Sequence, residues 1–323
     1  MNIQQIYKLA IEMGIKSDFR PKSQIKKQLK RIKEKYDKLS REEKEIFDKE
    51  RMANPYSDTR IYYDNGIKNV KRIMAGIDVE SAELMIARYL SNHNSKNPID
   101  LALIHHPVGL ALSNLTEVMH LQADVLAQSG IPINIAESLL KLRMEEVSRK
   151  INPENHFQPV DAAKMLDINF LGVHTPADNM AASFVKRIIE KEKPEYVGDI
   201  IKVLLKITEY KESAKRGAGP VIFVGSEESR TGKIIFAELT GGTNGSSKIY
   251  EAMAHAGVGT IVGMHMSEEH REEAKKAHIN VVIAGHISTD SLGMNLFLDE
   301  LEKKGIEIVP CSGLIRISRN KKR

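Results

Sequence analysis

A short apolar run that ends in two adjacent histidines constrains the fold of this chain more than any other feature. Leu101–Ile104 is followed directly by His105, His106 and Pro107. The apolar run is typical of a buried strand, and Pro107 ends it because proline has no backbone N–H for a sheet. A sheet holds the backbone of the following residues still, so these imidazoles are well placed for chemistry. Each can serve one ion of a metal pair; a purely structural role is the alternative.

Strand and helix patterns alternate on both sides of this run. In the first part of the chain we expect strands at 60–63, 70–77 and 167–173, with helices at 79–90 and from 174 to about 191. Farther along we expect strands at 221–225, 233–239, 260–264 and 280–284, with helices between them and a last helix that runs to 304. This alternation predicts an α/β protein.

The first 52 residues are strongly charged and helical in pattern. Within Lys22–Arg51, apolar residues recur at spacings of three and four, which predicts an amphipathic helix, and Ser40 with Glu43 predicts the start of another. We favour helices that pack on the core or on a neighbouring subunit, because acidic residues are interleaved with the lysines. A basic arm for nucleic acid or an acidic partner is the alternative.

Composition excludes several classes of protein. The single cysteine, Cys311, permits neither an intrachain disulfide nor a cysteine-based zinc cluster, and it fits a reducing compartment. No apolar run is long enough to cross a membrane, and the N-terminus shows no secretion pattern, so we expect a cytoplasmic protein with no membrane partner. Tryptophan is absent, which argues against a base-stacking platform.

Polar residues that commonly bind metals follow three of the predicted strands. They are His105 with His106, His174 with Asp178, and His286 with Asp290. The spacing H-x-x-x-D occurs twice, each time where a strand gives way to a helix. Residues four apart share one helical face, so the imidazole and the carboxylate can reach a common point. Nitrogen and oxygen ligands without thiolate suit Zn, Mn, Fe or Ni.

Three further features have two interpretations each. Asp78 follows a predicted strand, and we favour a helix cap over a polar group near the site. His120 lies in an apolar-periodic helix, and we favour a core or edge histidine over a ligand. The turn Gly241–Ser247 precedes a predicted helix that starts at Lys248, so it can hold a phosphate, with close packing of the chain as the alternative.

The three motifs in this order resemble the Nif-three-like family, also labelled GTP cyclohydrolase I type two homologue. The resembling segments are IDLALIHHPVG (99–109), HTPADN (174–179) and VVIAGHISTDSLGMNLFLDELEKKGIEI (281–308), and the resemblance extends over roughly 60–320. It implies two related α/β halves that face each other across a dinuclear metal site, and assembly into a ring-like homohexamer. On this basis we expect a helical extension at 1–55 and halves at about 56–215 and 216–323.

The resemblance also implies the residues of the site. Two divalent ions would be bound by His105, His106, Asp178, His286 and Asp290. One of the two carboxylates would bridge the ions, and His174 would lie near the site and orient a ligand or a bound water. If His174 stays off the metals, it can act as a general acid or base. Two departures bear on this site: Asp290 stands where the family usually has glutamate, and the chain has a helical insertion at about 112–150.

The function that follows is a dinuclear metal-dependent hydrolase acting on a nucleotide or a phosphoester-type small molecule. The turn at 241–247 and Lys248 would hold a phosphate. GTP is suggested only by the family label. The alternative function is a metal-binding scaffold or regulatory protein without turnover, which binds a protein or nucleic-acid partner.

Overall fold

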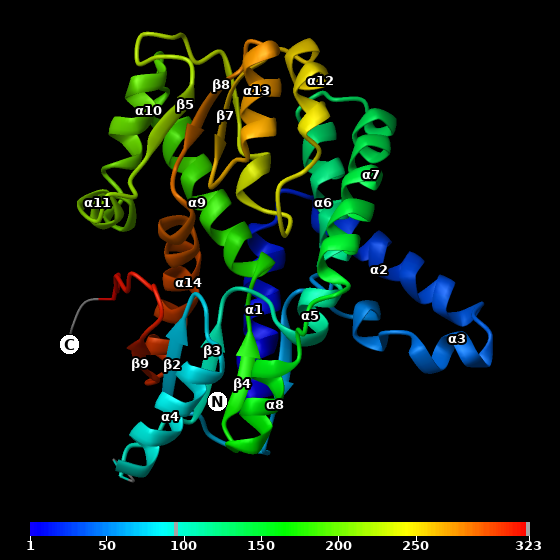
Figure 1. Ribbon diagram of the computed structural model, residues 1–323, viewed down its shortest axis with the longest axis vertical. Helices are drawn as coiled ribbons and strands as arrows, with labels where there is room; N and C mark the ends of the chain where they lie inside the picture. Colours follow the sequence, from blue (N-terminus) through cyan, green and yellow to red (C-terminus); the bar gives the residue numbers. More distant parts are fainter. Residues whose placement is uncertain (94–95, 321–323) are drawn as a thin grey trace.

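The computed structural model describes residues 1–93 and 96–320 and arranges the nine strands of these ranges in two sheets (Figure 1). In spatial order, the first sheet comprises β1 (Arg60–Tyr63), β4 (Asn169–Gly172), β3 (Leu101–Ile104), β2 (Arg72–Gly76) and β9 (Glu307–Pro310). The second comprises β5 (Val221–Val224), β8 (Asn280–Ile283), β7 (Val258–Gly263) and β6 (Lys233–Ile235). The predicted α/β class is confirmed.

Both sheets repeat one arrangement. Strands β2, β3 and β4 run parallel, with β1 antiparallel at the edge; β6, β7 and β8 run parallel, with β5 antiparallel at the edge. The carboxyl ends of parallel strands meet at one edge of a sheet, and in Figure 1 these two edges face each other across the middle of the molecule. The division at about residue 215 stays a prediction, and β9, which lies beyond it, pairs with β2 in the first sheet.

Two long helices cross from one half to the other. Helix α9 (Thr175–Glu192) follows β4 of the first sheet but packs on the second, where Val185 lies against the core that includes Val282. Helix α14 (His286–Lys303) follows β8 of the second sheet but packs on the first, where Phe297 joins the same core as Leu103. Each half is therefore covered by a helix that the other half supplies.

These two helices touch closely near their N-terminal ends. A Cβ atom at Gly293 of α14 would lie 2.2 Å from the carbonyl oxygen of Ala177 in α9. Only glycine permits this approach without displacement of a backbone. The contact brings the first turns of the two helices, which carry Asp178 and Asp290, into one place.

Shorter helices cover the remaining faces of the sheets. The first sheet carries α4 (Ser81–His93) and α8 (Gln158–Met165), and the second is flanked by α10 (Val197–Leu204), α11 (Thr208–Lys215), α12 (Tyr250–His255) and α13 (Glu268–Lys276). The predicted strand 233–239 was too long. It leaves the extended conformation at Phe236, and Ala237–Leu239 forms a 3-10 turn.

The predicted helical insertion consists of α5 (Gly109–Ser113), α6 (Leu115–Gln128) and α7 (Ile133–Ile151). Helices α6 and α7 pack together and share a core with the second half, in which Val125 and Leu140 join Ile249 and Met253. The insertion therefore starts in the first half and is anchored on the second.

The N-terminal segment divides into a buried part and a projecting part. Helix α1 (Ile3–Ser17) packs on α9, with Ile3 and Ile6 fully buried. Helices α2 (Lys22–Asp37) and α3 (Arg41–Ile46) project from the side of the molecule, on the right of Figure 1. The capping box that starts α3 is confirmed. Within residues 1–93 and 96–320, no helix has the length and apolar composition needed to span a bilayer.

Candidate metal centre

The candidate metal-binding side chains lie at the ends of strands from both sheets and meet in one place. Because β3 and β4 are parallel neighbours, His105 and His106 after β3 emerge beside His174 after β4. From the opposite side, β8 ends just before His286. The facing edges of the two sheets therefore bring together residues far apart in the chain, such as His106 and His286, which are separated by 180 positions.

The first group of potential ligands comprises His105, His174 and Asp178, all buried, with one ligand atom of each within 4.8 Å of the others. Nε2 of His105 lies 3.3 Å from Oδ1 of Asp178, and Nε2 of His174 lies 3.8 Å from Oδ2 of the same carboxylate. Three such atoms converging in the interior fit the binding of a metal ion.

The second group comprises His106, His286 and Asp290. The two Nε2 atoms lie 3.3 Å apart, and each is 3.4 Å from Oδ2 of Asp290. Four ligands about 2.0–2.1 Å from a tetrahedral Zn²⁺ lie roughly 3.3–3.4 Å from one another. The spacing in this group matches the edges of such a tetrahedron.

Asp290 lies between the two groups. Its Oδ2 atom faces His106 and His286, whereas its Oδ1 atom is 3.5 Å from Nε2 of His105. Both oxygens are buried, and the residue is only 1% exposed. The two oxygens of one carboxylate therefore point at histidines of different groups.

Three of the imidazoles are held from behind through Nδ1. His105 contacts the carbonyl oxygen of Val173 at 3.0 Å, His106 contacts Asp78 at 2.6 Å, and His174 contacts Asp58 at 2.8 Å. When Nδ1–H donates to such an acceptor, the lone pair is on Nε2, which here is the atom that faces the other ligands. Histidines that bind metals are typically fixed in this way.

Several buried polar atoms of the centre make no hydrogen bond with the part of the chain that the structure describes. They are Nε2 of His105, Oδ1 of Asp178 and both carboxylate oxygens of Asp290. An unpaired buried carboxylate oxygen costs free energy, and such groups in folded proteins usually bind a partner. A cation among these atoms would satisfy all of them, so the residues fit a metal ion.

The electrostatics of the centre favour a negative carboxylate at Asp290 and positive imidazoles at His105 and His106 in the absence of metal. Burial alone would raise the pKa of Asp290, but the neighbouring His105 and His106 hold it well below its usual range. Burial opposes protonation of His106, yet the nearby carboxylates of Asp290 and Asp78 raise its pKa to about 9. A bound metal ion has to displace these protons.

A small cavity opens beside the imidazoles. Its volume is about 30 Å³, and its lining includes His174, Asp178, His265, His286 and the loop residues 242–244. Of these, His265 was not expected as a site residue. Burial and the adjacent His286 lower the pKa of His265 to about 4, so its ring is neutral at neutral pH.

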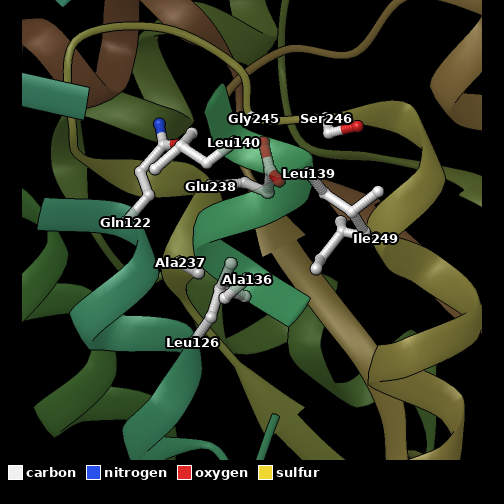
Figure 2. A pocket seen from close by; sticks show the side chains of 10 residues that line it. All are labelled: Gln122, Leu126, Ala136, Leu139, Leu140, Ala237, Glu238, Gly245, Ser246 and Ile249. Atoms are coloured by element: carbon white, nitrogen blue, oxygen red, sulfur yellow. The ribbon is translucent and has the colours of Figure 1, made fainter. Parts of the chain in front are cut away.

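The insertion braces the loop that lines this cavity. Nε2 of Gln122 in α6 donates to the carbonyl oxygens of Gly241, at 3.1 Å, and Thr243, and Nε of Arg143 in α7 donates to the carbonyl oxygen of Asn244 at 3.2 Å. Figure 2 shows side chains of α6 and α7 beside Ala237, Glu238, Gly245, Ser246 and Ile249. The void that these residues line has a volume of only about 10 Å³. The interface is closely packed.

Residues 242–244 of the glycine-rich turn at 241–247 thus line the cavity. The turn does not meet a long helix. The 3-10 turn Ser247–Ile249 and the six-residue α12 follow it, and the side chain of Ser246 accepts the hydrogen bond of the Lys248 N–H. Phosphate binding by this turn stays a prediction.

Comparison with solved structures identifies the fold. A NIF3 superfamily protein from Sphaerobacter thermophilus aligns with a TM-score of 0.76 over 97% of this chain and 99% of its own, at 24% sequence identity. The chain has the NIF3 fold. The sequence itself matches no family model, and comparison with curated proteins finds no match.

Other solved structures align less closely. Reduced HcgD from Methanocaldococcus jannaschii gives a TM-score of 0.45 at 15% identity, over 77% of this chain and 87% of its own. The protein TTHA1606 from Thermus thermophilus gives a TM-score of 0.44 at 15% identity, over 82% of this chain and 92% of its own. We base no conclusion on alignments at this level.

Within the NIF3 fold, the structure brings together every residue that the sequence singled out for the centre. The five predicted ligands, His105, His106, Asp178, His286 and Asp290, converge in the two groups described above. His174, predicted as a general acid or base, lies among them and contacts Asp178. Their individual roles stay predictions. His120 is exposed on α6 and is not among the residues that line the cavity.

The prediction for Asp78 was wrong. It does not cap α4, which begins at Ser81; its carboxylate contacts Nδ1 of His106. The fold explains this, because β2 and β3 are parallel neighbours and the residues after each strand emerge side by side. A polar residue two positions after a buried strand was the pattern that could have revealed it.

Asp58 and His265 were not predicted at all. Asp58 precedes β1, and it reaches His174 because β1 pairs antiparallel with β4, with Arg60 opposite Gly172. No local pattern reveals that pairing. His265 lies two residues beyond the ladder of β7, the position that His106 takes after β3. A histidine just after the predicted strand 260–264 was the available clue.

Proposed function

We propose that this protein is a dinuclear metal-dependent hydrolase. The observation that carries the proposal is the placement of Asp290, whose two oxygens face histidines of different groups. A carboxylate between two imidazole sets is the arrangement that a bridging ligand needs. It supports Asp290 rather than Asp178 as the bridge.

The ligands would divide between two ions. The first would be held by His105, His174 and Asp178 with one oxygen of Asp290, and the second by His106 and His286 with the other. We assign His174 to the first ion because Asp58 holds its Nδ1 and its Nε2 faces Asp178. This replaces the general acid–base role expected from the sequence. Zn, Mn, Fe and Ni all suit such a donor set.

When bound, divalent ions polarise a substrate oxygen and lower the pKa of water, so that hydrolysis proceeds near neutral pH. The chain supplies the environment for that chemistry. Asp58 and Asp78 orient the imidazoles of His174 and His106, and the two helix starts exclude bulk water from Asp178 and Asp290, which are 3% and 1% exposed.

The cavity favours a substrate that inserts only its reacting group. Its volume of about 30 Å³ is far below the roughly 300–1,000 Å³ of a pocket that encloses a whole small molecule. A terminal phosphoester of a nucleotide or a similar compound would enter, with the rest of the molecule on the rim formed by residues 242–244. His265 would meet it as a neutral imidazole.

Metal content and turnover of the same preparations test the proposal. Protein purified without an affinity tag is analysed by mass spectrometry as prepared and after loading with Zn or Mn, then assayed against nucleotides and phosphoesters. We expect about two ions per chain and hydrolysis of at least one compound. In the matched variant His106→Ala, we expect the second ion and the hydrolysis to be lost together.

Two results would contradict the proposal in different ways. Two ions per chain without hydrolysis of any compound would favour the metal-binding scaffold. No metal above the level of an unrelated protein, even after loading, would show that the centre does not bind ions.

A further inference from the structure

The charge of the molecule is concentrated on one projecting helix. Helix α2 carries seven basic and two acidic side chains, a net charge of +5, which equals the formal net charge of the whole chain. The remaining residues are therefore neutral in sum. In Figure 1, α2 extends away from both sheets, so this charge is presented to solvent at a distance from the metal centre.

The basic side chains of α2 form two rows on different sides of the helix. Lys27, Arg31 and Lys35 line a groove of about 600 Å³ between α2 and α6. The opposite wall of that groove is acidic, with Glu117, Asp124 and Glu137. The charges facing the groove are therefore partly neutralised within the molecule.

The other row points away from the groove. By helical spacing, Lys22, Lys26, Lys30 and Lys33 share one face, and all four are exposed. Lys30 contacts Glu34 at 3.7 Å, whereas Lys22, Lys26 and Lys33 form no ion pair with any residue in 1–93 and 96–320. We call these four lysines the outer row. The charges of Lys22, Lys26 and Lys33 are available to a partner, and Lys30 forms only an exposed pair within its own helix.

The apolar side of α2 packs against other parts of the chain. Ile25 is buried, and the ring of Tyr36 packs on Phe47 with centroids 5.0 Å apart. A helix that binds a membrane surface needs a free apolar face, and a protein interface is usually anchored by buried aromatic or aliphatic side chains. The outer row offers charge without an apolar anchor, which disfavours both kinds of partner.

We propose that the outer row of α2 binds the phosphate backbone of a nucleic-acid duplex. The helix of 16 residues is about 24 Å long, and a duplex carries about 14 phosphates over that length. Backbone binding requires only cations at the surface, and it carries no sequence preference. The outer row presents no aromatic ring, so stacking on single-stranded bases is not available to it.

The test measures binding of the full-length protein to a fluorescent 20-base-pair duplex, as DNA and as RNA, between 50 and 200 mM salt. Four phosphate contacts predict that affinity falls about 150-fold over this range. The variant Lys22→Gln/Lys26→Gln/Lys33→Gln keeps one outer lysine, so its affinity should fall only about 3- to 4-fold, from a weaker starting value. Equal affinities for the DNA and RNA duplexes would indicate binding to the phosphate backbone alone. A higher affinity for one duplex would identify the nucleic acid that the outer row binds.

A matched control removes the same charge elsewhere. Lys191, Lys211 and Lys304 are exposed on other helices or loops, and the variant with glutamine at these three positions should bind like the unaltered protein. Unchanged metal content and melting temperature would show that both variants fold. The proposal is overturned if the outer-row variant binds the duplex with unaltered affinity and salt dependence. It is also overturned if the two triple variants weaken binding equally, or if poly-glutamate or vesicles of anionic lipid bind as tightly as the duplex.

Discussion

At the scale of single residues, the two carboxylates of the centre differ in what their oxygens face. Both oxygens of Asp178 face histidines of the first group, at 3.3 and 3.8 Å. The oxygens of Asp290 face His105 on one side and His106 with His286 on the other. The shorter aspartate side chain at position 290 therefore spans the two groups. The family that the sequence motifs resemble usually has glutamate at this position.

This difference predicts unequal effects of the same substitution. If the site binds two ions as proposed, Asp290→Asn should reduce the metal content from about two ions per chain to near zero, because Asp290 would bridge both ions. Asp178→Asn should leave about one ion, held by the second group. Mass spectrometry of both proteins after dialysis against Zn measures this, and the amide keeps the size of each side chain. Equal metal loss in the two variants would rule out Asp290 as the unique bridge.

The ligands could be predicted from the sequence because each lies in a local pattern. H-x-x-x-D at the start of a helix requires only helical spacing to bring His286 and Asp290 together. The groups behind the imidazoles depend on strand pairing. Asp58 reaches His174 only because β1 runs antiparallel beside β4, and a sequence does not reveal the order of strands in a sheet.

At the scale of elements, the centre depends on how closely α9 and α14 approach. A Cβ atom at Gly293 would lie 2.2 Å from the carbonyl oxygen of Ala177, a distance that requires one helix to move. Asp178 is the next residue after Ala177, and Asp290 lies one turn before Gly293 on α14. Displacement of the helices would therefore separate the two carboxylates.

Accordingly, Gly293→Ala should weaken metal binding and lower stability. Overpacking of this kind typically costs about 1–3 kcal/mol. Isothermal titration with Zn and thermal unfolding of the metal-free protein measure the two effects. Glu300→Ala lies on the same helix, where its side chain pairs with Lys303 at the surface, and it should change neither. Tight metal binding by Gly293→Ala would show that the centre tolerates a wider helix separation.

The elements themselves were largely predictable, whereas their partners were not. Periodicity identified α6 and α7 as helices of an insertion, yet it could not show that Gln122 holds the carbonyl oxygens of the glycine-rich turn. That contact links residues about 120 positions apart. The projection of α2 was equally hidden, because the interleaved acidic residues led us to expect helices that pack on the core or on a neighbouring subunit.

At the scale of the whole molecule, the protonated imidazoles couple stability to pH. The pKa of His106 is about 9 in the folded, metal-free protein, above its ordinary value of 6.5, and that of His105 is also raised. A raised folded-state pKa means that the stabilisation is fully present below about pH 6.5 and is lost as the pH rises through about 9.

The metal-free protein should therefore melt at a lower temperature at pH 9.5 than at pH 6.5. The free energy of unfolding should fall by about 2 kcal/mol, which corresponds to a few °C in melting temperature. This value is smaller than the pKa shift alone would give, because Asp78 is largely exposed and solvent screens its charge. Metal-loaded protein, whose imidazoles are already neutral, should show a smaller decrease. Calorimetry of both forms at the two pH values measures this, and a metal-free protein whose melting temperature rises with pH in this range would contradict it.

The two-halved architecture was expected only because the motifs resemble a known family, and the structural comparison confirms the fold. Periodicity alone gave the α/β class. The exchange of α9 and α14 between the halves was not predicted, since both helices have ordinary apolar stripes that fit either sheet. Which sheet receives them is decided by the packing of the complete molecule.

That exchange sets an order of events during protein synthesis. Helix α14 and edge strand β9, which complete the first sheet, come from residues 286–310. Strand β2 of the same sheet is already complete when Gly76 has been synthesised. At about 5–20 residues per second, roughly ten to fifty seconds separate the two. During that interval Ile73 lacks the part of its core that α14 supplies, including Phe297 and Leu298, and the same holds for Leu103 and Leu171 once they are synthesised. A nascent chain of this design has to be shielded, by chaperones or by its own transient contacts, until its last segments emerge.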